Sequence, residues 1–417
     1  VTDEIKRRIQ LLGYSQQHDF VITEIGGTVG DIESLPYIEA ARQLRYELGA
    51  DNVLFIHLTL VPFIRVAGEL KSKPTQHSVK QLLENGVQPD VLVLRTEKHL
   101  PEEFRKKIAL FCNVDPKAVM QSIDVPTIYE VPLMMQGERL DEVVLKKFNI
   151  EGAPEADMEA WKRFVEKSKH PKGKISVGLV GKYVELHDAY KSILEALNHA
   201  GVYNECEVKI HFFQSEKVDE QNVAAQLKDM DGILVAPGFG ERGIEGKITA
   251  AAYARTHNVP FLGICLGMQC AVVELARHVL GYKDAHSSEI NPSTPHKVID
   301  IMENQKHITN LGGTMRLGAY KCRLKEGTLA HRIYGQAETT ERHRHRYELN
   351  NAYLPELEEK AGMLASGVNE QTGLVEIIEL PRHRFFIASQ FHPEFQSTVL
   401  NPHPLFMAFV KNMSGGA

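Results

Sequence analysis

One cysteine of the chain stands in a glycine frame, at residues 261–269 (FLGICLGMQ). Apolar residues typical of a buried strand precede Cys265, and a helix pattern follows it. Gly263 and Gly267 would keep a sharp strand-to-helix turn free of side-chain clashes. A helix N-terminus and an adjacent histidine both favour the thiolate, which is the nucleophilic form of cysteine. The pattern therefore predicts that Cys265 attacks a carbonyl carbon.

A histidine and a glutamate follow a second apolar strand pattern far downstream, in the segment SQFHPEF at 389–395. His392 can take the thiol proton and return it to a leaving amine, and Glu394 can fix the tautomer of His392. The backbone N–H of Leu266, directly after the nucleophile, can stabilise an oxyanion. These residues predict a Cys-His-Glu triad. The other cysteines have no such frame and are interpreted as core or surface thiols: Cys112, Cys206, Cys270 and Cys322.

A segment rich in glycine and acids follows an early apolar run, at residues 24–34 (EIGGTVGDIES). Glycines let backbone amides approach phosphates, and carboxylates hold Mg²⁺ through oxygen. Ligands of parallel α/β sheets bind at the carboxyl ends of strands, where this segment is expected. The segment therefore predicts a phosphate and metal site, with a simple tight turn as the alternative.

A basic loop, KSKPTQHS at 71–78, precedes a predicted helix. Two lysines at a helix N-terminus favour an anion through both charge and dipole. Lys107, on a later helix, can add a third cation. A solvated loop and an ordinary surface charge are the alternatives.

The bulk composition restricts the classes of function. The chain has 417 residues, 43% of them hydrophobic, and a net charge of −6. The length indicates two or three domains, and the charge gives no general case for nucleic acid or an anionic membrane. Five scattered cysteines without CxxC spacing argue against a disulfide framework or a zinc site and fit a reducing cytoplasm. The sequence shows no membrane-spanning run and no signal peptide.

The segments that carry these predicted catalytic and binding residues need a scaffold, and two α/β patterns along the chain predict one. The first predicts strands at 20–25, 53–60, 91–94 and 118–121, with helices at 36–48, 76–85 and 102–111. The second predicts strands at 175–180, 208–213, 232–235 and 260–264, followed by short strands and hairpins within 315–378. A polar linker at 151–173 carries one amphipathic helix around Trp161. The predicted fold class is α/β, with two domains that each hold a mostly parallel sheet flanked by helices.

Seven motifs in order along the chain resemble the CTP synthase family: EIGGTVGDIES, KSKPTQHS, KIALFCNV, PGFGERGIEGK, GICLGMQ, ERHRHRYE and SQFHPEF. The resemblance spans nearly the whole chain. It implies a P-loop-like amidoligase domain at 1–150, a linker at 151–173 and a class I glutamine amidotransferase domain at 174–417. The family's reaction is the ATP-dependent amination of UTP to CTP with ammonia from glutamine, in pyrimidine nucleotide biosynthesis.

The resemblance also implies roles for residues of the first domain. Glu24 would bind Mg²⁺. Asp31, Ile32 and Glu33 would contact CTP. The adenine of ATP would lie against Ile123, Asp124 and Val125. The UTP or CTP site would be formed by Lys71, Ser72, Lys73, Pro74, Thr75, Gln76 and Lys107.

In the second domain, the resemblance makes Gly238 the other oxyanion donor and Arg316 a GTP-linked residue. Glutamine would be held by Leu266, Gly267, Met268, Gln269, Glu289 and Arg346. The family further implies GTP as an allosteric activator, CTP as a feedback inhibitor, a homotetramer that can form filaments, and a cytoplasmic location. In the run RHRHRY at 342–347, His343 and His345 are interpreted as structural, and the arginines are not read as a nucleic-acid surface.

Two features depart from the family pattern. Its opening phosphate loop, with the Gly-Lys-Gly motif, does not occur in this sequence, so we expect an incomplete N-terminal domain with that segment absent. Ala236-Pro237-Gly238 stands where many members have Pro-Gly-Gly, which retains the glycine donor. Three alternatives stay open: a different amidotransferase that makes GMP or carbamoyl phosphate, a glutaminase-only fragment, and a structural or filament subunit without synthetase activity.

Overall fold

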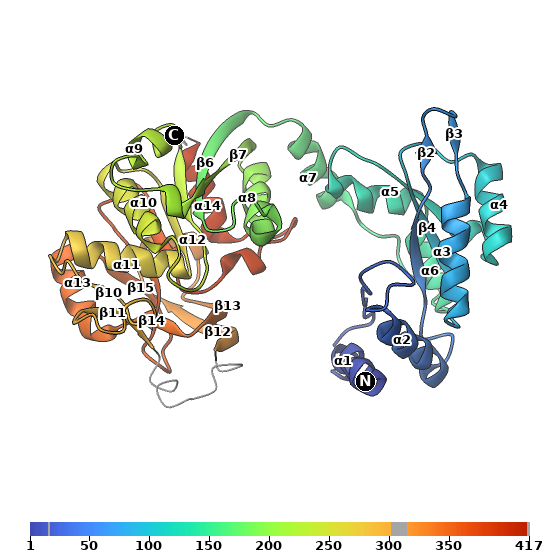
Figure 1. The fold of residues 1–417 in the computed structure, drawn as a ribbon, viewed down its shortest axis with the longest axis horizontal. Helices are drawn as coiled ribbons and strands as arrows, with labels where there is room; N and C mark the ends of the chain where they lie inside the picture. The colour runs from blue at the N-terminus through green and yellow to red at the C-terminus, as the bar shows by residue number, and fades with distance from the viewer. Residues whose placement is uncertain (16, 302–314, 415–417) are drawn as a thin grey trace. The chain divides into compact units, whose positions relative to one another are not determined.

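A computed structural model describes residues 1–15, 17–301 and 315–414, and the chain divides into two compact units (Figure 1). The first unit is Val1–Met158 and the second is Glu159–Ala417. The division falls inside the polar stretch 151–173, just before α7 (Glu159–Lys169). No helix in the described part of the chain is long and apolar enough to cross a membrane.

The first unit is built on a three-stranded parallel sheet, in the order β1 (Ile56–Leu60), β4 (Val91–Thr96), β5 (Val119–Ile123). β4 is central, and its first four residues form a buried apolar run, as expected for a central strand of a parallel sheet. A hairpin, β2 (Phe63–Ile64) and β3 (Glu69–Leu70), follows β1. The helices of this unit are α1 (Thr2–Tyr14), α2 (Leu35–Leu48), α3 (Lys73–Glu84), α4 (Glu102–Cys112), α5 (Val131–Gly137) and α6 (Leu140–Lys147).

The strand predicted at 20–25 is wrong. These residues are irregular and exposed, and the Ile22 side chain is 96% exposed. Phe20 instead contacts the ring of Phe148, with 5.8 Å between ring centroids. An apolar run becomes a strand only when a neighbour pairs with its backbone, and no strand among the described residues pairs with this one.

The second unit holds a nine-stranded sheet, in the order β13-β12-β15-β16-β17-β9-β8-β6-β7. Its parallel half is β17 (Phe386–Ser389), β9 (Phe261–Ile264), β8 (Gly232–Val235), β6 (Gly173–Gly181) and β7 (Cys206–Gln214). Its antiparallel half is β13 (Glu338–His345), β12 (Arg316–Leu324), β15 (Leu364–Val368) and β16 (Val375–Glu379), which pairs with β17. A small separate sheet joins β10 (His286–Ser287), β11 (Lys297–Ile301) and β14 (Tyr347–Leu349).

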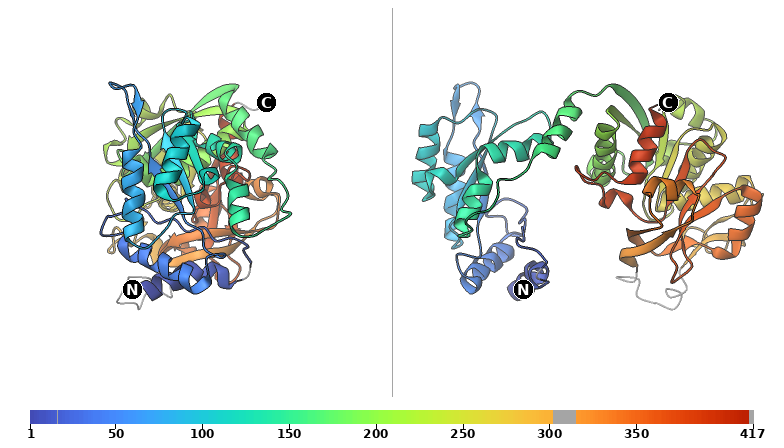
Figure 2. Two further views of the ribbon diagram at one scale, coloured as in Figure 1. Left: turned by 90° about the vertical axis from the view of Figure 1, so that its right-hand side faces the viewer. Right: turned by 180° about the vertical axis from the view of Figure 1, so that it is seen from behind.

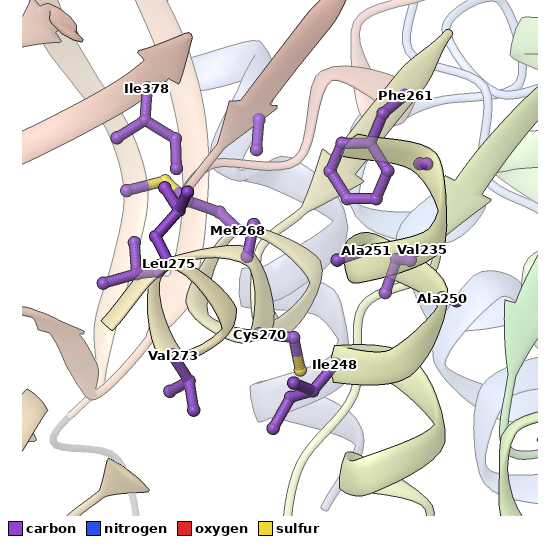
Figure 3. Close-up of a cluster of buried hydrophobic side chains, with 14 of the residues drawn as sticks. Val235, Ile248, Ala250, Ala251, Phe261, Met268, Cys270, Val273, Leu275 and Ile378 are labelled. Atoms are coloured by element: carbon purple, nitrogen blue, oxygen red, sulfur yellow. The ribbon is translucent and has the colours of Figure 1, made fainter. Parts of the chain in front are cut away.

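Helices cover both faces of the large sheet, as Figure 1 and the rear view in Figure 2 show. One buried cluster joins the sheet to α10 (Ile244–Thr256), α11 (Leu266–His278) and α13 (Leu354–Ala361), with α9 (Val223–Leu227) at its margin. Figure 3 shows Phe261, Met268 and Leu275 within this cluster. The opposite cluster contains α8 (Lys191–Tyr203), α12 (Leu329–Tyr334) and α14 (Pro404–Met413). The predicted fold class is confirmed.

β13 has a strict alternation of side chains. His343 and His345 are buried, whereas Arg342 and Arg344 are exposed. Successive side chains of a strand point to opposite faces, so this run sends its histidines inward and its arginines outward. The strand thus supplies two imidazoles to the interior of the second unit.

Candidate active site

Cys265 occupies a sharp turn between β9 and α11. Its φ is 53° and its ψ is −104°, a conformation that residues with a Cβ rarely adopt. The turn is held by the Cys265 N–H, which donates to the Ser389 carbonyl on β17 at 2.7 Å. Strained backbone of this kind persists only where the surroundings impose it, and it is frequent at catalytic residues. The arrangement is that of a nucleophile elbow.

The two glycines that flank Cys265 are required by close packing. A Cβ on Gly267 would lie 2.2 Å from the Val235 carbonyl oxygen, and one on Gly263 would lie 2.9 Å from the Ala388 Cβ. The first contact is with backbone, which has little freedom to move. The glycine frame therefore lets α11 begin directly against the neighbouring strand β8.

The His392 imidazole is buried beside the nucleophile. Its Nδ1 lies 2.7 Å from Oε1 of Glu394, and its backbone N–H donates to the Arg342 carbonyl at 2.8 Å. Burial lowers the pKa of His392, but interactions with Cys265 and Glu394 outweigh it and raise this pKa to about 10. These interactions favour the imidazolium form. Because Nδ1 is paired with Glu394, the buried Nε2, which has no hydrogen-bond partner among the described residues, is the nitrogen left to exchange a proton with the thiol.

A small cavity opens at Cys265. It is lined by Gly238, Phe239, Cys265, Gln269, Glu289, Met315, His345, Arg346 and Tyr347. Of the residues predicted to hold glutamine or its oxyanion, Gly238, Gln269, Glu289 and Arg346 thus lie around one space. Leu266 and Gly267 form the first turn of α11, where backbone N–H groups are free of intrahelical partners. The Met268 side chain lies away from the cavity, in the core against the sheet.

Two lysines hold the loop that carries Gly238. Lys247 is fully buried, and its ammonium donates to the carbonyl oxygens of Ala236 at 2.6 Å and Pro237 at 3.3 Å. Lys182 donates to the carbonyls of Phe239 and Gly240, and the Gly240 N–H donates to Glu289 Oε1 at 3.1 Å.

Burial lowers the pKa of Lys247 to about 8 and lowers that of Lys182. Sequence reasoning missed both residues. For Lys247 the available signal was a single lysine among the small apolar residues of α10.

A buried polar cluster adjoins the cavity through His345. Arg316 is 7% exposed, and its Nη1 lies 2.7 Å from Oε1 of Glu376. Burial, together with the Arg316 charge, lowers the pKa of His343 to about 2 and that of His345 to about 3. Burial raises the pKa of Glu376 to about 7 and that of Glu348 to about 8. The structure therefore gives Arg316 a buried ion pair with Glu376, and its GTP-linked role stays a prediction.

The acidic segment of the first unit is open to solvent. Glu24, Asp31, Ile32 and Glu33 are exposed on irregular chain that leads into α2. Asp31 Oδ2 accepts a hydrogen bond from the Thr28 N–H at 3.1 Å, which closes a turn. Carboxylate oxygens in this segment have the chemistry that Mg²⁺ prefers.

The basic loop meets the carboxyl edge of the parallel sheet. Thr75 Oγ1 lies 3.1 Å from Thr59 Oγ1 and donates to the Leu60 carbonyl at 3.2 Å, which anchors the start of α3 at the end of β1. Thr75 has no exposed surface, so neither its side chain nor its backbone is open to solvent. Asp124 lies just beyond β5, at the same edge, 3.5 Å from Arg95.

The other residues predicted to bind UTP or ATP differ in their exposure to solvent. Ser72 is buried and accepts a hydrogen bond from Gln76 Nε2 at 3.2 Å, and Lys71 is paired with Glu69. Ile123 ends β5 and is partly buried, as is Val125. The exposed members are Lys73, Pro74 and Lys107.

Comparison with known proteins gives matches for both units. The family model of the CTP synthase N-terminus matches residues 1–150, and that of the class-I glutamine amidotransferases matches residues 185–412. A CTP synthase of Cytophaga hutchinsonii is 61% identical over 411 residues, covering 99% of this chain and 76% of the relative. One of Flavobacterium psychrophilum is 62% identical over 410 residues, covering 98% and 76%.

A solved structure is similar to the second unit. The glutaminase domain of Trypanosoma brucei CTPS, with bound acivicin, is 38% identical with a TM-score of 0.55, covering 58% of this chain and 94% of that one. The comparisons also correct one expectation. The family model of the CTP synthase N-terminus matches residues 1–150, so the expectation that the N-terminal segment is absent is wrong.

Proposed function

The chain belongs to the CTP synthase family, and we propose that Cys265, His392 and Glu394 release the ammonia it uses. Its reaction is the ATP-dependent amination of UTP to CTP, with glutamine as the nitrogen donor. The observation that carries the assignment of the triad is the placement of a buried His392–Glu394 pair against a cysteine on a strained turn.

The chemistry at Cys265 follows from this placement. The thiolate attacks the side-chain amide carbon of glutamine, and the resulting oxyanion accepts hydrogen bonds from the N–H groups of Leu266 and Gly238. Protonated His392 gives its proton to the leaving ammonia. The same imidazole then takes a proton from the water that hydrolyses the thioester, while Glu394 holds the ring in place.

The cavity residues suit a free amino acid. Glu289 offers a carboxylate to the α-ammonium of glutamine, and Arg346 offers a guanidinium to the α-carboxylate. Gln269 lines the site, and the first-turn residues Gly267 and Met268 would contribute through the backbone at the start of α11. Opposite charges at two places fix the orientation of the substrate, so that its amide points toward the sulfur.

In the first unit, the nucleotide residues are proposed from the family resemblance. The start of α3 and the end of β5 also lie at the carboxyl edge of the sheet. Lys73 and Lys107 would bind phosphates, and Ile123 with Val125 would border the adenine of ATP. Glu24 would bind Mg²⁺, which neutralises phosphate charge when bound. Asp31 and Glu33 add carboxylate oxygens in the same segment.

Regulation and assembly are proposed on the same basis. GTP would activate the enzyme, CTP would inhibit it, and a homotetramer in the cytoplasm would be the working form. We place the amidoligase domain at 1–150, the linker at 151–173 and the amidotransferase domain at 174–417.

The decisive experiment separates the two reactions. Cys265→Ala should abolish CTP formation from glutamine and retain CTP formation from ammonium chloride. Equal loss with both nitrogen sources would contradict the two-site mechanism. Glutamine hydrolysis by the unmodified protein without CTP from either source would support a glutaminase without synthetase activity.

A further inference from the structure

Gln390 places a polar group directly against the nucleophile. Its side chain is fully buried, and its Nε2 donates to Cys265 Sγ at 3.6 Å. Its backbone N–H donates to the Glu376 carbonyl at 2.8 Å, which fixes the chain just after β17. A buried amide is expected to find a complete set of partners, and here one partner is the reacting sulfur.

The orientation of this amide follows from its neighbours. The Tyr347 carbonyl can only accept, so the atom of Gln269 that lies 2.8 Å from it must be the nitrogen. The same Gln269 nitrogen lies 3.2 Å from the Gln390 side chain, which must therefore present its oxygen there. The remaining end of the Gln390 amide, its NH₂ group, then faces Cys265.

A second chain of hydrogen bonds reinforces the first. His345 Nδ1 lies 3.1 Å from the Tyr347 carbonyl, and its Nε2 lies 3.0 Å from His343 Nδ1. Because both histidines are buried beside the Arg316 charge, they are held neutral. His345 therefore donates from Nδ1 to the Tyr347 carbonyl, and His343 donates from Nδ1 to Nε2 of His345. His343, His345 and Glu376 have ligand atoms within 4.8 Å of one another, but the Arg316 guanidinium already supplies the cation there.

From this geometry we infer that Gln390 is a further catalytic residue of the glutaminase site, which stabilises the Cys265 thiolate and aims it at the substrate. An N–H donor to a charged acceptor is a strong interaction, worth roughly ten- to hundredfold in an equilibrium or rate. The amide is neutral, so it favours the thiolate without competing for the proton that His392 must carry. The inference deepens the proposed function and rests on it.

Other groups also act on the sulfur and must stay constant in a test. His392, which follows β17, and Lys247, on α10, both interact electrostatically with Cys265. Glu289, His345 and Arg346 line the same cavity. Substituting Gln390 leaves all of these groups in place.

The test measures the rate of alkylation of Cys265 by iodoacetamide against pH, with the modified peptide identified by mass spectrometry. For Gln390→Met, the midpoint of the profile should move up by about one pH unit, and kcat/KM for glutamine hydrolysis should fall roughly ten- to hundredfold. Gln390→Glu keeps the shape but turns an acceptor toward the sulfur, so its midpoint should move further. Gln269→Leu frees the Gln390 amide to rotate and should give a smaller shift in the same direction.

Gln396→Met is the matched control, because Gln396 is exposed and bonds to Thr340 and Glu341, away from the sulfur. It should leave the midpoint unchanged. A wild-type midpoint in folded Gln390→Met or Gln390→Glu would overturn the inference, whatever the change in melting temperature. Alkylation needs no substrate, so a shifted midpoint in a protein that does not hydrolyse glutamine would support the role of Gln390 and contradict the proposed function.

Discussion

The ammonium nitrogen of Lys247 lies 2.6 Å from the carbonyl oxygen of Ala236, although Lys247 has no exposed surface. A buried lysine is costly, and burial lowers its pKa to about 8. That cost is offset by hydrogen bonds to the two residues before Gly238. The position of the Gly238 N–H therefore depends on a lysine that the substrate never touches.

Lys247→Met should test this dependence. Methionine fills similar space but cannot donate, so the loop at 236–240 should lose its anchor and misplace one oxyanion donor. We expect kcat for glutamine hydrolysis to fall roughly a hundredfold, the usual effect of losing such a donor. Steady-state kinetics would measure it, with the exposed Lys228→Met as control. A wild-type kcat in folded Lys247→Met would contradict the anchoring role.

Gly267→Ala should damage the elbow itself. The added Cβ would lie 2.2 Å from the Val235 carbonyl, so α11 must shift and carry the Leu266 N–H with it. We expect a loss of about 3 kcal/mol or more in unfolding free energy and loss of glutamine hydrolysis. Gly173→Ala is the control, because its Cβ would meet only Cys206, at an ordinary 4.0 Å. Chemical denaturation would compare the two variants, and equal stabilities would contradict the packing argument.

The pH dependence of stability should report on Glu348. Its folded pKa of about 8 exceeds the usual 4.5, so between these values the folded state binds a proton that the unfolded state has released. Its contribution to stability is therefore complete below about pH 4.5 and is lost as the pH rises through about 8.

Glu348→Gln has no such proton. The unfolding free energy of this variant relative to wild type should rise with pH over the same range, by up to roughly 5 kcal/mol. Denaturant titrations at several pH values would measure the difference, with the exposed Glu359→Gln as control. A difference independent of pH would show that Glu348 ionises normally in the folded protein.

The Arg316–Glu376 pair should show strong coupling. Arg316→Met leaves a buried carboxyl without its cation and should cost about 3–5 kcal/mol. Glu376→Gln in the same chain removes the stranded charge, so the double variant should recover much of that loss. A double-mutant cycle of unfolding free energies measures the coupling. Additive single effects would mean that the two side chains do not stabilise each other.

Lys73→Ala should affect only the nucleotide reaction. This exposed lysine begins α3, where a phosphate would meet both its charge and the helix N-terminus. We expect the KM for UTP to rise roughly tenfold in CTP formation from ammonium chloride, with glutamine hydrolysis unchanged. Lys80→Ala, on the exposed side of the same helix, is the control. An unchanged KM would remove Lys73 from the proposed UTP site.

Local patterns predicted much of this molecule. The strands β8 and β9 are short apolar runs that are buried on both faces, and such runs are legible in sequence. Cys265, His392 and Glu394 each stand in a compact motif, so they could be proposed together before their geometry was known. Their roles stay a prediction, although the structure places them side by side.

The remainder depended on contacts between distant parts of the chain. Lys182 donates to the carbonyls of Phe239 and Gly240, which are 57 and 58 positions further along the chain. Gln390 donates to the sulfur of Cys265, which is 125 positions earlier. No local pattern distinguishes such residues from other buried polar groups. The error at 20–25 has the same origin, because strand formation depends on a pairing partner that the sequence of the segment does not specify.

The alternation of histidine and arginine along β13 also specifies the register in which that strand pairs with β12 during folding. A slip of one residue against β12 would turn Arg342 and Arg344 into the interior and His343 and His345 into solvent. Two guanidinium groups without partners would make that misaligned hairpin very unfavourable. The four side chains thus favour one register of β13 against β12 over registers shifted by one residue, so this strand helps to specify the pairing of the sheet.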